Sequence, residues 1–347
     1  MNLRSILKSV FCLFAFFAAG ALAQEELNLY IWSEYIDPEI ITAFEKEFNC
    51  KVVVSLYESN EEMLAKLQAG GVSQYDLVVP SDFIMPSLIQ LGLLQPIDRA
   101  AVPNIKNLND NFVNPSFDPG NTYSVGWQWG TVGIVYNKDK FKEPVTSWKS
   151  IFEPADGIKF MLFDSEREMI GGALRYLGSS INTMDKKELM AAANLMIADK
   201  KKSGFMGFEG NVGGRNKVIA GTVDIAMAYN GDVIQSMTEH DNLGFVNPKE
   251  GTVIWLDSLA IPAKAPNAKL AMKFMNFILN PKVGAQLSNF NQFATPNKAS
   301  MPMITPVDLK NPAIYPDAEA EKRLEYINDL GKNNAVYSEL WKMVKTR

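Results

Sequence analysis

Apolar and polar positions in the first third of the chain alternate between the spacing of a strand and the spacing of a helix. Residues 27–31 and 51–57 alternate or are β-branched, which predicts strands, and 75–80 is a third apolar run of that kind. Helical spacing separates them, over 38–48 and over 59–70, where Ser59 and Glu62 have capping-box spacing. Strand, helix, strand, helix and strand with short connections predict a parallel α/β unit.

The same alternation returns in the second half of the chain. The pattern predicts strands over 158–163 and 224–229, and helices over 167–177, 186–200 and 267–279. A second α/β unit is therefore expected, followed by a tail of helices.

Two extended stretches separate the α/β units. Residues 123–136 are extended and interrupted by glycine, and 251–262 contains two apolar runs on either side of Trp255 and Asp257. We interpret both as crossovers between two similar α/β lobes. The predicted division is 24–131 with 258–300 for lobe 1, and 132–257 with 301–347 for lobe 2.

The N-terminus is predicted to be a secretory signal peptide over residues 1–23. Arg4 and Lys8 precede an apolar run, and Ala21-Leu-Ala23 forms a small-residue cleavage site, which leaves Gln24 first in the mature chain. No second apolar run suggests membrane insertion after the signal is removed. Since Cys12 leaves with the signal, Cys50 is alone and no intramolecular disulfide is expected.

Composition excludes several classes of function. The net charge of −5 becomes more negative once Arg4 and Lys8 are removed, and no basic stripe indicates nucleic-acid binding. His240 is the single histidine, which argues against a histidine-clustered zinc site and a Ser-His-Asp triad. The nucleophile-elbow, P-loop and dinucleotide-binding motifs are missing, so neither a cofactor nor a metal is predicted.

Rings and acids collect at predicted strand ends and crossovers, where ligands bind in parallel α/β sheets. Trp255 and Asp257 lie two residues apart, so in an extended backbone both project from one face and suit a small organic cation. The candidate ligand-binding residues are Trp32, Ser33, Glu34, Tyr35, Ser81, Phe83, Glu168, Tyr229, Asp232, Trp255, Asp257 and Phe293. Such a set fits a flexible chain bearing two or more ammonium groups, with each buried methylene worth roughly 0.8 kcal/mol.

Other interpretations of these residues stay open. Ser81, Asp164 and Asp232 stand where helix N-caps belong, and Phe83 and Phe293 are candidates for core residues. Two carboxylates beside aromatic walls also describe a glycoside hydrolase, although nothing in the sequence marks an acid–nucleophile pair.

The mature chain resembles the polyamine-binding periplasmic proteins, the spermidine/putrescine-binding subunits of ABC transporters. The resemblance is carried, in shared order, by Tyr30-Ile-Trp-Ser-Glu-Tyr35, Tyr57-Glu-Ser-Asn60, Tyr75-Asp-Leu-Val-Val-Pro-Ser81, Trp255-Leu-Asp-Ser-Leu-Ala-Ile-Pro262, Ala294-Thr-Pro-Asn297 and Tyr315-Pro-Asp-Ala318. It implies a two-lobed periplasmic-binding-protein fold of type II, with two β-crossovers as the hinge and the ligand cleft between the lobes. It also implies a monomeric, non-enzymatic receptor in the periplasm that delivers a polyamine to an ABC permease.

Carried over by position, the resemblance assigns roles to the candidate residues. Trp32, Tyr35 and Ser81 match ligand contacts of lobe 1, while Glu168, Trp255 and Asp257 match the carboxylates and ring that hold amino groups and methylenes. Tyr229 replaces a tryptophan, and Phe83 and Phe293 stand where tyrosines occur.

Two departures bear on which polyamine is bound. Ser165 stands where spermidine-preferring members carry an aspartate, and Ile327 where they carry a glutamine, whereas Glu34 and Asp232 match aspartates of putrescine-preferring members. The resemblance therefore implies a hybrid site that leans towards a diamine. A polyamine sensor that docks on a signalling receptor, and a receptor for another amine or an amino acid, remain alternatives.

Overall fold

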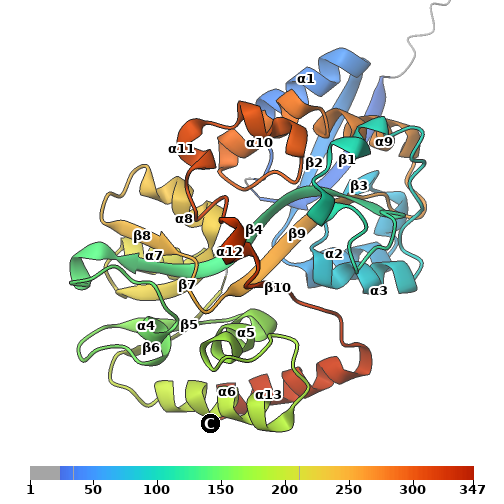
Figure 1. Cartoon of the computed structure of the whole chain (residues 1–347). Coiled ribbons are helices and arrows are strands. Elements are labelled where there is room, and N and C mark those ends of the chain that lie inside the picture. Colours follow the sequence, from blue (N-terminus) through green and yellow to red (C-terminus); the bar gives the residue numbers. More distant parts are fainter. Residues whose placement is uncertain (1–23, 34, 211) are drawn as a thin grey trace, which may run out of the picture.

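The strands of the computed structural model, which describes residues 24–33, 35–210 and 212–347, form one sheet. Within these residues the sheet has ten strands in the order β2-β1-β3-β9-β4-β7-β5-β6, with β10 beside β9 and β8 beside β4. Helices pack on both faces, which confirms the predicted α/β class (Figure 1). The predicted signal peptide, 1–23, and Glu34 lie outside the described residues.

Lobe 1 is a parallel sheet between two layers of helices. Its strands are β1 (Glu25–Trp32), β2 (Cys50–Tyr57) and β3 (Leu77–Val78). Its core on one face includes side chains from α1 (Pro38–Phe48), α9 (Ala268–Ile278) and α10 (Pro281–Asn291). On the other face the packing helices are α2 (Asn60–Gln68) and α3 (Met85–Gln90). Residues far apart in sequence thus share the core of lobe 1.

Side-chain caps define the first two helices. Asp37 accepts a hydrogen bond from Glu39 N at 2.8 Å, and Pro38 at the first helical position has the required φ already set. Ser59 Oγ accepts from Glu62 N at 3.1 Å, as the capping-box spacing predicts, but the Glu62 carboxylate accepts from Glu58 N.

Lobe 2 repeats the arrangement of layers. Its strands are β5 (Phe160–Phe163), β6 (Phe205–Glu209), β7 (Ile225–Tyr229) and β8 (Leu243–Val246). One core includes side chains of α4 (Lys149–Phe152), α5 (Glu166–Tyr176), α6 (Lys186–Asp199) and α13 (Asn334–Thr346). The opposite core includes side chains of α7 (Gly213–Ile219) and α8 (Asn230–Met237). Strands β6 and β8 were not predicted from the sequence.

Two long strands join the lobes, as predicted. β4 (Ser124–Asn137) and β9 (Thr252–Ala260) pair antiparallel, with Trp129 opposite Leu256, and every residue of β4 is buried. β4 continues into lobe 2, where it pairs with β7 and β8. β9 is one continuous strand through Trp255 and Asp257, where the sequence predicted two separate extended runs.

A third connection runs from lobe 1 to lobe 2 through α11 (Pro306–Leu309), α12 (Ala318–Glu321) and β10 (Leu324–Tyr326). Before it, Met303 O and Thr305 N hydrogen-bond to Asn289 of α10, which places this part of the chain beside lobe 1. β10 then pairs in parallel with β9. The tail ends in a helix, α13, as predicted, and β10 before it was not predicted.

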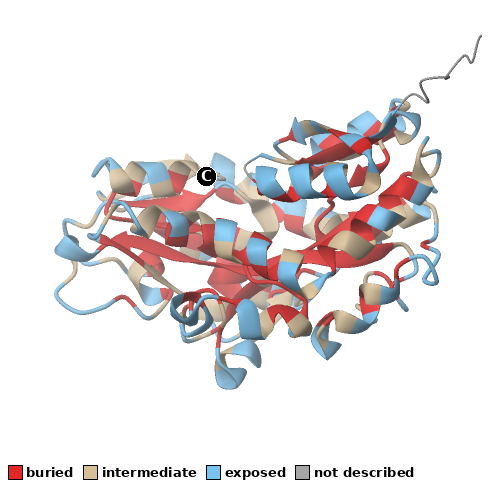
Figure 2. Cartoon of the chain, turned by 90° about the horizontal axis from the view of Figure 1, so that it is seen from above, coloured by how far each residue is buried: buried red, intermediate tan, exposed pale blue. Residues whose placement is uncertain are grey.

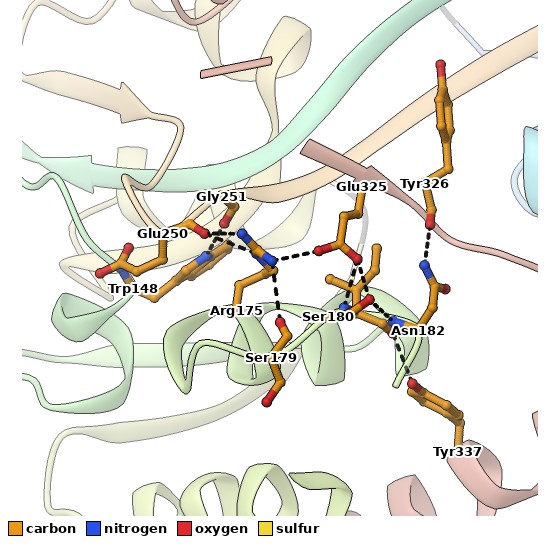
Figure 3. Close-up of polar contacts among 11 residues, drawn as sticks. Trp148, Arg175, Ser179, Ser180, Asn182, Glu250, Gly251, Glu325, Tyr326 and Tyr337 are labelled. Carbon is orange, nitrogen blue, oxygen red and sulfur yellow. Dashed lines mark hydrogen bonds and ion pairs between the residues drawn. The ribbon is translucent and has the colours of Figure 1, made fainter. Parts of the chain in front are cut away.

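A cluster of polar contacts connects β10 to lobe 2 near the first residue of β9 (Figure 3). Arg175 Nη1 lies 2.6 Å from Glu325 Oε1, and Arg175 Nε donates to Glu250 O at 3.0 Å. Asn182 Nδ2 donates to Tyr326 O at 2.8 Å. Gly251 has a φ of +94°, and a Cβ there would lie 2.1 Å from Arg323 O, so glycine permits this close approach.

Buried residues follow the strands and the inner helix faces through both halves of the molecule, and exposed residues lie on the outer helices (Figure 2). Among the helices of the described residues, none combines the length and apolar character that a membrane span requires.

Candidate functional site

The predicted lobe 1 residues gather at the carboxyl ends of β1 and β3. Trp32 ends β1, and its Nε1 donates to Val79 O at 3.0 Å. The hydroxyl of Tyr57, at the end of β2, donates to the same carbonyl at 2.5 Å, and its ring lies 4.6 Å from the Trp32 ring. Trp32 thus lies at the edge of the sheet where the strand-end rule predicts ligand binding, and its ring packs against Tyr57 there.

Asp257 is a buried carboxylate on the strand that joins the lobes. It is 7% exposed and forms a β-bridge with Ser81, at the carboxyl end of β3. Its Oδ1 has no hydrogen-bond partner among the described residues, and the same is true of the buried hydroxyl of Tyr35. Burial raises the pKa of Asp257 to about 7, while the nearby hydroxyls of Ser81 and Tyr35 act in the opposite direction. A cationic donor would satisfy this carboxylate.

A chain of aromatic rings runs from lobe 1 to lobe 2 past Asp257. The Phe293 ring lies 5.4 Å from Tyr35 and 5.4 Å from Trp255, in edge-to-face orientations. Trp255 in turn lies 6.2 Å from Tyr229, with the ring planes at 88°. Trp255 packs against the hydrophobic cores of both lobes. These rings provide the apolar walls that methylene groups require.

Glu168 provides a second carboxylate, from lobe 2. It lies in the first turn of α5, and the Tyr229 hydroxyl donates to its Oε1 at 2.9 Å. Burial raises the pKa of Glu168, and hydrogen bonds from Ser165 and Tyr229 oppose this shift. Ser165, the position that departs from the spermidine-preferring pattern, therefore contacts Glu168.

Asp232 and Phe83 also lie where the lobes meet. Burial raises the pKa values of Tyr35 and Tyr229, and the charge of Asp232, in the first turn of α8, adds a smaller effect to both. A Cβ on the preceding Gly231 would lie 2.2 Å from the Phe293 ring, so the start of α8 touches lobe 1. Phe83, although part of lobe 1, packs against the core of lobe 2.

The capping interpretation is wrong for Asp164 and Asp232, and for Ser81 it holds for the position but not for the side chain. Ser81 occupies the N-cap position of the short helix η2 (Asp82–Ile84) without a side-chain cap; its Oγ accepts from Asn60 Nδ2 at 3.1 Å. The N-cap of α5 is Ser165, so Asp164 lies one residue earlier, and the N-cap of α8 is Tyr229, so Asp232 lies within the helix. Helix capping therefore does not explain these residues.

Two further predicted positions have different outcomes. Ser33 lies in the turn after β1 and is exposed, apart from the buried set. Phe293 is 8% exposed and belongs to the core of lobe 1, as the alternative interpretation predicted, yet its ring also touches Trp255. Ile327 is buried in the core of lobe 2.

The sequence analysis missed one buried carboxyl group of this region. Asp82, between Ser81 and Phe83, is 3% exposed, and its side chain reaches β9. Within the described residues no cluster of three or more histidine, cysteine or acidic side chains has a metal-binding arrangement. Two surface hollows, of about 530 and 650 Å³, lie elsewhere in lobe 1, along α10 and beside the α1–β2 turn.

Comparison with known proteins identifies the family. The family described as bacterial extracellular solute-binding protein matches residues 39–316. The chain belongs to this family. The spermidine/putrescine-binding periplasmic protein of Escherichia coli is 37% identical to this solute-binding protein over 339 residues, covering 94% of this chain and 97% of the relative. The putrescine-binding periplasmic protein SpuD of Pseudomonas aeruginosa is 33% identical and covers 94% of each chain.

Solved structures of solute-binding proteins share the fold. The spermidine/putrescine ABC transporter substrate-binding protein PotD from Streptococcus pneumoniae superposes with a TM-score of 0.85 and 31% identity, covering 93% of this chain and 99% of that one. The spermidine/putrescine ABC transporter protein from Listeria monocytogenes superposes with a TM-score of 0.81 and 33% identity, covering 93% and 99%. The two-lobed periplasmic-binding-protein fold of type II is thus confirmed.

Proposed function

We propose that this protein is an exported receptor that captures putrescine and/or spermidine by lobe closure and delivers it to an ABC permease. The observation that carries the proposal is the buried Asp257, whose Oδ1 lacks a partner among the described residues beside the ring chain of Trp255. The names of the relatives, which are spermidine- or putrescine-binding periplasmic proteins, support it. The receptor binds its ligand without chemical change, as a monomer in the periplasm after removal of 1–23.

Three carboxylates define how a diamine binds. One ammonium group pairs with Asp257 and the other is held at the lobe 2 end, where Glu168 and Asp232 lie, with the methylenes against Trp255 and Phe293. Contacts from both lobes exist only in the closed form, so the ligand stabilises closure. Seven further residues complete the ligand contacts of the proposed site: Trp32, Ser33, Glu34, Tyr35, Ser81, Phe83 and Tyr229.

Calorimetric titration of the mature protein tests the function directly. We expect both putrescine and spermidine to bind, with putrescine at least as tightly, because Ser165 and Ile327 provide neither a charge nor a polar group of the kind that spermidine-preferring members carry. Tenfold tighter binding of spermidine, about 1.4 kcal/mol, would contradict the diamine preference. Failure of both polyamines to bind would contradict the function itself.

The raised pKa of Asp257 predicts a pH-dependent affinity. Because an ammonium group pairs with the ionised carboxylate, a proton bound to Asp257 below its pKa of about 7 must leave before the amine binds. Putrescine affinity should therefore fall up to about tenfold for each pH unit below about 7. Calorimetry from about pH 5 to pH 8 measures this slope. In Asp257→Asn, the part of the pH dependence of putrescine affinity that Asp257 causes should disappear. If affinity in this variant still falls with pH as in wild type, another residue causes the pH dependence.

A further inference from the structure

Asp82 is a buried carboxyl group at the carboxyl end of β3 that the proposed contacts leave unused. Its Oδ1 accepts a hydrogen bond from Phe83 N at 2.7 Å. Its Oδ2 accepts one from Leu256 N, on β9, at 3.3 Å. A side chain of lobe 1 therefore binds the backbone of the strand that joins the lobes.

The hydrogen bond to Leu256 fills a gap along one edge of β9. β10 pairs with that strand only as far as Ile254, and Ser258 N donates to Pro80 O at 3.0 Å. On this edge of β9, the N–H of Leu256 lies between Ile254, which pairs with β10, and Ser258, which bonds to Pro80 after β3. It therefore has no backbone partner from either neighbour. An unpaired buried N–H is costly, so Asp82 replaces a missing strand at this position.

Leu256 is also the residue between Trp255 and Asp257. Fixing its peptide group fixes the direction of both neighbouring side chains, since side chains alternate along a strand from a single backbone orientation. Asp82 thus acts on the ligand site through Leu256, without itself being assigned a ligand contact.

The charges around Asp82 connect it to the carboxylate that meets the ligand. Burial raises the pKa of Asp82 well above its ordinary value; the negative charge of Asp257 on β9 adds to this shift, as does Glu168 on α5. The backbone N–H groups of Phe83 and Leu256 act in the opposite direction. Tyr326 on β10 is the other titratable group coupled to it, and its own pKa is raised by burial and by Asp82. Asp82 is therefore electrostatically coupled to Asp257 as well as hydrogen-bonded to the residue beside it.

We propose that Asp82 is a positioning residue that holds the Trp255–Asp257 pair in place from lobe 1 by accepting a hydrogen bond from the peptide N–H of Leu256. The inference rests on the polyamine-binding function proposed above.

Asp82→Asn and Asp82→Ala test the positioning role by calorimetry with putrescine. Asparagine keeps the side-chain volume but has one acceptor oxygen for the two N–H groups, and alanine has none. We expect the affinity to fall at least about tenfold in Asp82→Ala, and by less in Asp82→Asn. The matched control is Asp76→Asn, at the amino end of β3: Asp76 is equally buried and accepts from Asn28 N at 2.8 Å. The control should lower the thermal stability without changing the affinity.

The outcomes separate this inference from the proposed function. Wild-type protein that binds neither putrescine nor spermidine contradicts the function. A folded Asp82→Ala that binds putrescine with wild-type affinity overturns the role of Asp82. An equal loss of affinity in Asp76→Asn would show that any buried carboxylate of lobe 1 has the same effect, and would also overturn it.

Discussion

Asp257→Ala is expected to weaken putrescine binding by at least about 1.5 to 3 kcal/mol, roughly 10- to 150-fold in Kd. The substitution removes a 7%-exposed carboxylate whose Oδ1 has no protein partner within the described residues, so the ammonium group of the ligand loses its charge-assisted hydrogen bond. The β-bridge between Asp257 and Ser81 involves the backbone and remains. Calorimetry of the mature protein measures the loss.

The stability of the ligand-free variant provides the control. A buried carboxylate with an oxygen that lacks a partner destabilises the folded state, so Asp257→Ala should unfold at a temperature close to that of wild type. Asp257→Asn, which keeps the volume and removes the charge, should lose affinity without losing stability. Wild-type affinity in both variants would mean that the ligand site lies elsewhere.

Gly231→Ala is expected to weaken binding by obstructing contact between the lobes. The new Cβ would lie 2.2 Å from the Phe293 ring, a distance at which the ring or the start of α8 must move. Overpacking of this kind costs about 1 to 3 kcal/mol, and the cost applies only where Phe293 of lobe 1 and α8 of lobe 2 are in contact. Affinity for putrescine should fall by a corresponding factor of about 5 to 150.

Gly172→Ala is the matched control for this substitution. A Cβ on Gly172, inside α5, would meet the Trp148 ring at an ordinary 3.5 Å, and alanine favours a helix interior over glycine. The control should therefore bind putrescine like wild type and unfold at the same or a higher temperature. If Gly231→Ala also kept wild-type affinity, the contact between Phe293 and α8 would have no part in ligand capture.

The sequence pattern predicted the elements that have a strong period of their own. β1 alternates clearly, and α9 carries its apolar residues on one face, so the positions of these two elements followed from spacing alone. β6, β8 and β10 have three to five residues each and were missed, because so short a segment becomes a strand only when a neighbour offers backbone partners. For β10 that neighbour is β9, more than 70 residues away in sequence.

The candidate site shows the same division. Trp255 and Asp257 were recognisable because they belong to one strand at a spacing that puts both side chains on one face. Asp82 was passed over because its importance depends on a gap along β9 that only the arrangement of β3 and β10 creates. Gly231 was missed for the same reason, since nothing local in the sequence indicates the Phe293 ring opposite it.

The shared core of lobe 1 has a consequence for how this chain is made. That core unites Leu29 on β1 with Phe274 on α9 and Leu287 on α10, so it cannot close until nearly the whole chain has been synthesised. Contacts between such distant segments form slowly, because long loops must close before the packing stabilises them. Until α9 and α10 have been made, β1 and α1 lack the partners that complete this core. The discontinuity of lobe 1 thus postpones its folding, which would leave the chain unfolded during the export proposed here.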